Sequence, residues 1–214
     1  MIKEFEKRLL SSFILIPIVI FFIIQGSVFF VFFLSILFLV TSYEWLKMNI
    51  KNNLLKLLGV IFLLFSFYSA FFLRDTLGPD FFLFIICVCI FTDIGGYIFG
   101  KLFKGPKLIK ISPKKTYAGV VGGFLFSLIA ALSFIKITES FYLETQSLNT
   151  FSSIFMISLI SQIGDLIISY FKRLAKIKDT GKIIPGHGGI LDRIDGLIFA
   201  IPTAYILILI IGLI

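Results

Sequence analysis

Three carboxylates flank the one long polar segment in the C-terminal half of this sequence. Asp165 lies near the end of one apolar run, and Asp192 and Asp195 lie three residues apart at the start of the next. Residues three apart on a helix share one face, and helix capping would explain only one of the two acids. Carboxylate oxygens, with phosphate oxygens completing the shell, are the usual ligands of Mg²⁺. The spacing therefore predicts that Asp165, Asp192 and Asp195 bind a metal ion.

The polar segment between these carboxylates, residues 169–195, has the composition expected around a bound anion. It contains six of the chain's twenty Lys and Arg residues and its only His. The Gly-rich turn at 185–189 can present consecutive backbone N–H groups to an anion. Ser169, Lys172 and Arg173 continue the helix face of the first carboxylate. Together these features predict a site for a metal-bound polyphosphate, and no Walker A sequence is present to make it a P-loop.

A second basic segment, Ser112-Pro113-Lys114-Lys115-Thr116, precedes another apolar run. Thr116 has the side chain and position expected of a helix N-cap. The adjacent lysines Lys114 and Lys115 lie at the expected membrane surface and could hold the phosphate of a lipid. Simple anchoring of the helix by charge is the alternative.

One further acid, Asp93, lies inside an apolar run. A carboxylate at such a position costs about 2.5–3.5 kcal/mol on membrane-insertion scales, so we expect Asp93 to have a function. The glycines around it have another role. Gly96 and Gly100, and Gly119 and Gly123 on the next run, form two G-x-x-x-G patterns, which more often mark close helix packing than a ligand site.

The elements that must position these residues are membrane helices. The chain has 214 residues, of which 58% are hydrophobic, and a mean hydropathy of +1.06. Apolar runs near 20 residues predict an all-α polytopic membrane protein with about seven transmembrane helices. We expect these at about 9–25, 27–46, 54–73, 80–103, 116–137, 151–171 and 193–214. Residues 1–80 would be accessory helices, and residues 81–214 the catalytic core with cytoplasmic loops 101–115 and 172–193.

The distribution of basic residues predicts the orientation. Eighteen of the twenty Lys and Arg residues fall on one side if the N-terminus is cytoplasmic and the C-terminus lies on the outer side. The net charge of +8 then faces anionic lipid or an anionic soluble substrate. Nucleic acid is not expected as a partner, because the basic residues stay close to the membrane and lack interleaved exposed aromatics.

With these residues in view, the chain resembles the phosphatidate cytidylyltransferase (CDP-diacylglycerol synthase) family. The positions that fit the family signature are Ser169, Lys172, Arg173, Lys178, Asp179, Gly181, Pro185, His187, Gly188, Gly189, Asp192, Arg193 and Asp195. The segments 112–116, 164–165, 93–100 and Glu44-Trp45 also look like family segments. Two features depart from the family: Ala118 stands where it usually has Glu, and the chain has fewer N-terminal spans than many members.

The resemblance implies a reaction, its cofactor and its site residues. CTP and phosphatidate would give CDP-diacylglycerol and pyrophosphate, with one or two metal ions, at least one of them Mg²⁺ and a second, monovalent ion left open. The implied catalytic residues are Asp165, Asp192, Asp195 and Lys172. The implied substrate-binding residues are Ser112, Lys114, Lys115, Thr116, Ser169, Arg173, Lys178, Asp179, His187, Gly188, Gly189, Arg193 and Asp93.

The resemblance also implies where the protein works and what it meets. We expect a bacterial inner membrane with the active site facing the cytoplasm, with CTP and membrane phosphatidate as partners and a homodimer left open. Two alternatives remain at this stage. One is a related CTP-dependent enzyme acting on another lipid phosphate or on a polyprenol. The other is an ion-coupled transporter, which acids within spans could serve, although no clear internal repeat is present.

Overall fold

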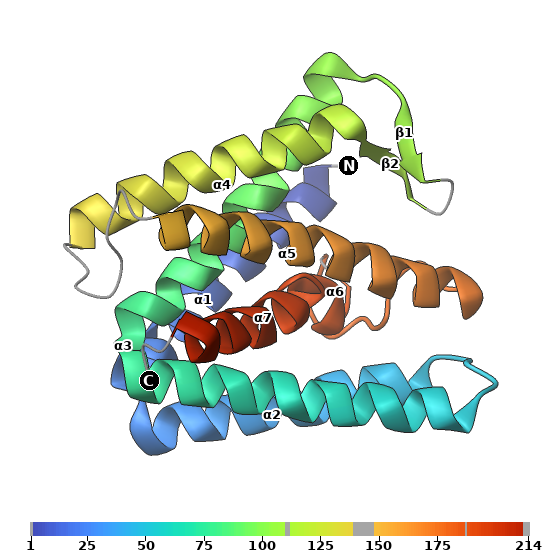
Figure 1. Cartoon of the computed structure of the whole chain (residues 1–214). Coiled ribbons are helices and arrows are strands. Elements are labelled where there is room, and N and C mark those ends of the chain that lie inside the picture. The colour runs from blue at the N-terminus through green and yellow to red at the C-terminus, as the bar shows by residue number, and fades with distance from the viewer. Residues whose placement is uncertain (1, 110–111, 139–147, 187, 212–214) are drawn as a thin grey trace.

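Helices make up most of the computed structural model, which describes residues 2–109, 112–138, 148–186 and 188–211 (Figure 1). The elements are α1 (Ile2–Gln25), α2 (Ser27–Lys47), α3 (Asn53–Phe103), β1 (Lys107–Ile109), β2 (Ser112–Thr116), α4 (Tyr117–Thr138), α5 (Leu148–Leu174), α6 (Leu191–Ile194) and α7 (Leu197–Ile211). Within the described residues, α2, α3, α4 and α5 are long and apolar enough to cross a membrane. The chain is therefore an all-α membrane protein, as its composition predicted.

The third and fourth predicted helices form one long element, α3, with a kink. Gly78 has φ +84° and ψ 173°, outside the helical region, and Pro79 follows it. Proline lacks the N–H that would continue the helix, and glycine tolerates positive φ, so the helix changes direction here. The first half of α3 runs along α2, and the second half turns away and crosses to α4 (Figure 1).

The last predicted helix, 193–214, is divided into α6 and α7. The break falls at Asp195-Gly196, where a Cβ on Gly196 would lie 2.5 Å from the hydroxyl of Ser161 on α5. Glycine thus allows α5 to approach at this point. Asp195 keeps a helical backbone (φ −57°, ψ −37°), so Asp192 and Asp195 still lie near one face of the chain.

A β-hairpin occupies part of the segment that was expected to be a loop, 101–115. Strands β1 and β2 pair antiparallel, with Lys107 opposite Thr116 and Ile109 opposite Ser112. Helix α3 ends before it at Lys104 and Gly105, both with positive φ. Helical periodicity does not reveal such a short hairpin. The hairpin gives the second basic segment a defined conformation.

Glycines hold the second half of α3 directly against α4, as the G-x-x-x-G spacing predicted. A Cβ on Gly119 would lie 2.8 Å from the carbonyl oxygen of Gly96. A Cβ on Gly95 would overlap the carbonyl oxygen of Gly122, and these two residues make the tightest approach although they lie outside the predicted pattern. Close backbone contact of this kind is the usual way in which small residues associate helices in membranes.

Replacing Gly122 by Leu should force α3 and α4 apart. The new side chain would meet Phe99 and the carbonyl of Gly95, and overpacking of this kind costs about 1–3 kcal/mol. We expect a lower midpoint of thermal unfolding in detergent and less folded protein. Val121→Leu is the matched control, because Val121 is the neighbouring residue and is exposed. Equal midpoints for the two variants would contradict the packing role.

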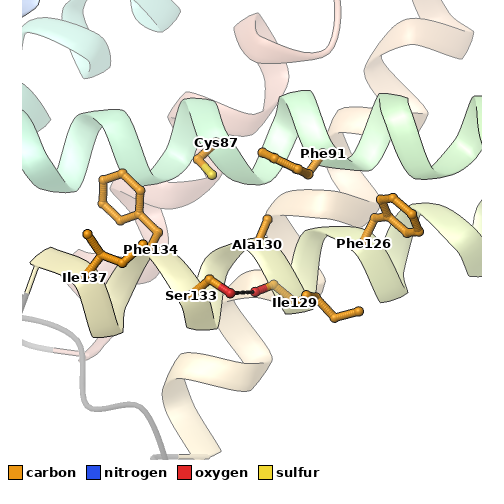
Figure 2. A pocket seen from close by; sticks show the side chains of 8 residues that line it. All are labelled: Cys87, Phe91, Phe126, Ile129, Ala130, Ser133, Phe134 and Ile137. Atoms are coloured by element: carbon orange, nitrogen blue, oxygen red, sulfur yellow. Dashed lines mark hydrogen bonds between the residues drawn. The ribbon is translucent and has the colours of Figure 1, made fainter.

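A groove of about 390 Å³ opens between α3 and α4 toward the C-terminal end of α4 (Figure 2). Cys87 and Phe91 line it from α3, facing Phe126, Ala130 and Phe134 of α4. Its lining is apolar, because the hydroxyl of Ser133 donates to the backbone carbonyl of Ile129 within its own helix. This groove offers no group to bind a polyphosphate, so the polar site lies elsewhere.

Candidate active site

The basic segments meet at one end of the helical bundle. The connection from α2 to α3, the β1–β2 hairpin and the connection from α5 to α6 lie at this end (Figure 1). The kink in α3 and the C-terminal end of α7 lie at the opposite end (Figure 1). The fold therefore brings together the two polar segments that the sequence separates by more than fifty residues.

Asp165 on α5 joins the hairpin to the helices. The Nζ atom of Lys115 on β2 lies 2.6 Å from the Oδ2 atom of Asp165 and donates to the carbonyl oxygen of Gln162 at 3.3 Å. The hydroxyl of Ser169 donates to Oδ1 of Asp165 at 3.2 Å, as the spacing of four residues predicted. The Lys115 and Asp165 side chains are 25% and 30% exposed, so a solvated ligand can reach this pair.

Lys172, one turn beyond Ser169, contacts both aspartates that follow the polar segment. Its Nζ atom lies 2.8 Å from Oδ1 of Asp192 and 3.8 Å from Oδ2 of Asp195. The side chains of Lys172 and Asp192 are only 11% and 3% exposed. A nearly buried ion pair of this kind is costly to break, because the remaining charge would lose its partner. Lys172 thus links the end of α5 to α6.

Asp192 also closes the loop that leads to it. Its Oδ2 atom accepts hydrogen bonds from the backbone N–H of Thr180 at 2.7 Å, from the Thr180 hydroxyl at 3.1 Å and from the N–H of Gly189 at 3.1 Å. Burial acts to raise the pKa of Asp192, but the bonds from Lys172, Thr180 and Gly189 outweigh it, and the pKa lies below its ordinary value. Asp192 is therefore held as a carboxylate in one orientation.

Asp195 has a different environment. It accepts a hydrogen bond from the N–H of Gly196 at 3.0 Å, and its ion pair with Lys172 is long. Burial, and then repulsion from Asp165, raise the pKa of Asp195, with a further contribution from Asp93 and opposition from Lys172. Acids from α3, α5 and the α6–α7 junction therefore repel one another electrostatically. A cation would relieve this repulsion.

The chemistry of these acids suits Mg²⁺, because all are hard oxygen donors. Among the residues that the structure describes, however, no three His, Cys, Asp or Glu side chains form a group placed to hold a metal. Lysine ammonium groups lie against the oxygens of Asp165 and Asp192 instead. The assignment of Asp165, Asp192 and Asp195 as metal ligands stays a prediction.

Other predicted residues have local roles in the structure. The Thr116 hydroxyl accepts from the N–H of Gly119 at 3.1 Å, which confirms the predicted helix cap. Arg173 is exposed and donates to the carbonyl of Ile177 at 3.1 Å. Gly188 has φ +94° and lies beside Asp179, so a side chain there would be strained and crowded. Substrate contacts of these residues stay predictions.

The remaining predicted residues surround the site. Lys178, Asp179 and Arg193 are exposed, and Ser112 is partly exposed at the start of β2. His187 lies outside the described residues, as does the side chain of Lys114. Ala118, where the family usually has Glu, occupies the first turn of α4 and is partly buried.

The sequence predictions missed two residues that the structure connects to the site, Glu44 and Thr180. The hydroxyl of Thr180 lies 3.0 Å from Oε2 of Glu44, which is on α2. The available signal was an acid within an apolar run, the same signal that identified Asp93. Glu44 was named only as part of the Glu44-Trp45 segment that looks like a family segment, and it was assigned no role in the site.

Comparison with known proteins places the chain in a family. Residues 50–211, from the start of α3 to the end of α7, match the model of the cytidylyltransferase family. The chain is 35% identical over 205 residues to a phosphatidate cytidylyltransferase of Rickettsia bellii (strain RML369-C), covering 92% of this chain and 88% of the relative. It is 37% identical over 212 residues to that of Rickettsia felis, covering 92% and 89%. It is 36% identical over 176 residues to that of Staphylococcus aureus (strain COL), covering 80% and 66%. Because the family model matches most of the chain and these relatives are at least 35% identical to it, the chain belongs to the cytidylyltransferase family.

Proposed function

We propose that this chain transfers CMP from CTP to phosphatidate, giving CDP-diacylglycerol and pyrophosphate. The observation that carries the proposal is the pairing of Lys115 with Asp165 and of Lys172 with Asp192, which ties the hairpin and the end of α5 to acids of the predicted site. On this proposal one segment would lie at the membrane surface, where a lipid phosphate is available, and the other would open to solvent, where CTP is available. The names of the relatives support this assignment.

The reaction depends on stabilising negative charge more than on transferring a proton. A phosphate oxygen of phosphatidate attacks the α-phosphorus of CTP, and the bond to the oxygen that bridges the α- and β-phosphates breaks. Pyrophosphate leaves with the electron pair of that bond. A phosphate monoester is largely ionised at neutral pH, so the attacking oxygen requires no general base, and no such role is assigned to His187. Cations placed in advance offset the repulsion between the two anions and the charge that builds on the leaving group.

The residues of the chain divide this work between two regions. Ser112, Lys114, Lys115 and Thr116 would hold the phosphatidate headgroup. Arg173, the loop lysines and the turn around Gly188 would hold the triphosphate. Asp165, Asp192 and Asp195 would hold one or two Mg²⁺ ions, which supply positive charge to the leaving pyrophosphate when bound. Lys172 would keep Asp192 and Asp195 oriented.

We also infer seven spans, with the N-terminus in the cytoplasm and the active site facing the cytoplasm of a bacterium. The gathering of the basic connections at one end of the bundle supports this orientation (Figure 1). The apolar segments Ser11–Gln25 and Leu197–Ile210 are shorter than the other candidate spans and would complete the count together with the two halves of α3.

The deciding experiment is incubation of the purified protein with labelled CTP and phosphatidate, with and without Mg²⁺. We expect labelled CDP-diacylglycerol and an equal amount of pyrophosphate, both dependent on Mg²⁺. Release of CDP with a polyprenol acceptor would identify a kinase instead. Absence of any product from both acceptors would reject the proposed function.

Replacing Lys114 and Lys115 together by Ala should raise the KM for phosphatidate more than the KM for CTP. Loss of a charge-assisted hydrogen bond costs about 1.5–3 kcal/mol, so we expect an increase of about 10-fold or more. The matched control is Lys107→Ala, which removes an exposed charge from the other strand of the same hairpin. A larger effect on the KM for CTP would show that these lysines bind CTP, and the assignment of the two binding regions would be reversed.

A further inference from the structure

Glu44 is among the most deeply buried charged residues described, with 1% of its surface exposed, and no step of the proposed reaction uses it. It lies near the end of α2, in the part of the chain that the sequence suggested was accessory. Its carboxylate accepts hydrogen bonds from the N–H of Ile190 to Oε1 at 3.1 Å and from the N–H of Leu191 to Oε2 at 2.8 Å. The Thr180 hydroxyl is its third partner, and all three lie in the segment from Thr180 to the start of α6, just before Asp192.

The loop leaves room for this carboxylate by means of two glycines. A Cβ on Gly189 would lie 2.6 Å from Oε2 of Glu44, and a Cβ on Gly181 would overlap Oε1. Neither glycine has a positive φ, so space rather than backbone conformation excludes a side chain there. The two ends of the loop thus close around the Glu44 carboxylate.

A continuous series of contacts leads from Glu44 to the acids of the site. The Thr180 hydroxyl lies 3.0 Å from Oε2 of Glu44 and 3.1 Å from Oδ2 of Asp192, so its single proton faces both carboxylates. Asp192 is paired in turn with Lys172, which also approaches Asp195. Helix α6 has four residues and cannot orient Asp192 alone. Its first backbone N–H groups are satisfied from outside by Glu44, as helix N-termini require.

Other contacts already hold α2 in place. Trp45 packs edge-on against Phe171 and donates its indole N–H to the carbonyl of Lys56 at 3.0 Å. Trp45, Met48, Ile168 and Leu191 belong to one buried apolar cluster. Loss of the Glu44 charge would therefore loosen the loop before it would detach the helix.

We propose that Glu44 is a positioning residue for cytidylyl transfer. Its carboxylate joins Thr180 to the backbone of Ile190 and Leu191, and through Thr180 it orients Asp192 and Lys172. Glu44 touches no substrate, and its effect on the reaction passes through the loop. On this reading α2 is part of the catalytic unit. The role rests on the proposed function, although the clamping of the loop itself does not.

The test compares Glu44→Gln with Thr41→Val. Gln keeps the shape of Glu but turns an amide N–H₂ toward a backbone N–H donor, so one hydrogen bond between residue 44 and the loop is lost. Thr41 is a buried polar residue one turn away on α2 that donates only to carbonyls of its own helix. We expect Glu44→Gln to lower kcat by about 10- to 100-fold, as is usual for residues that orient catalytic groups, with the KM for phosphatidate unchanged. Thr41→Val should have the kcat and the KM of the wild type.

Two further measurements separate positioning from folding. Amide hydrogen exchange of the peptide covering 180–191 should accelerate in Glu44→Gln while the thermal midpoint stays near that of the wild type. Thr180→Val should reproduce the loss of kcat, and Thr180→Ser, which keeps the hydroxyl, should restore it. The double variant Glu44→Gln, Thr180→Val should lose less than the product of the two single losses, because both act through one contact.

The outcomes are distinct. If amide hydrogen exchange in the loop of Glu44→Gln is unchanged, Glu44 does not hold the loop. Faster exchange with normal kcat would overturn the positioning role. A fall in activity that only parallels a fall in folded protein would assign Glu44 to stability and also overturn that role. Absence of activity in the wild type would reject the proposed function, and loop exchange would still decide whether Glu44 holds the loop.

Discussion

Replacing Asp195 by Asn should nearly abolish CTP-dependent turnover while the protein remains folded. The Asp195 side chain is 16% exposed and is repelled by Asp165 and Asp93, and within the described residues it accepts a short hydrogen bond from the N–H of Gly196. Asn has the same shape and can accept that bond, so the fold does not need the charge. The reaction does need it, and we expect turnover to fall by about 10³-fold, the upper end of the loss when one preorganised group is removed. The measurement is CDP-diacylglycerol formed per mole of folded protein.

Asp192→Asn should lose activity to a similar extent and should also loosen the loop. Oδ2 of Asp192 accepts three hydrogen bonds and Oδ1 accepts the ammonium of Lys172, so an amide N–H₂ must face a donor in either orientation. Its thermal midpoint should lie below that of Asp195→Asn. Asp75→Asn is the control, since Asp75 is exposed on α3 near the kink, at the opposite end of the bundle. Near-normal turnover in both site variants would refute the metal assignment.

Lys172→Met should have the second largest effect, on stability as well as on activity. Methionine fills a similar volume but leaves Asp192 and Asp195 without their shared cation. Removing one partner of a buried ion pair costs about 3–5 kcal/mol, because the remaining charge is uncompensated. We expect a clearly lower thermal midpoint and a large loss of turnover. The pair of Lys115 and Asp165 is more exposed, so Lys115→Met should reduce the midpoint much less.

A double variant makes the Lys172 prediction sharper. If the cost comes from the unpaired carboxylate, then adding Asp192→Asn to Lys172→Met should recover part of the lost stability. Lys172→Arg keeps the charge and should remain more stable than Lys172→Met. A Lys172→Met midpoint equal to that of the wild type would show that the ion pair does not hold α5 to α6.

The sequence by itself determined the features that depend on near neighbours. Apolar runs predicted the helices, because a helix that crosses lipid must satisfy its own backbone and expose apolar side chains. Spacing of four residues placed Ser169 on Asp165, and the order of residues predicted the Thr116 cap. The G-x-x-x-G spacing predicted that α3 and α4 pack closely. The signature over 169–195 indicated the family because it is a contiguous set of residues.

Only the tertiary structure decided which distant groups meet. The pairing of Lys115 with Asp165 joins β2 to α5, and the contact of Glu44 with Thr180 spans 136 residues of sequence. The hairpin, the kink at Gly78 and the break at Gly196 were likewise not predicted. Helical periodicity tells which face of a helix is apolar and leaves open which helix will cover it. A buried carboxylate is stable only where hydrogen-bond donors from several elements reach it. Packing across the whole bundle therefore decides which groups pair with the buried charges.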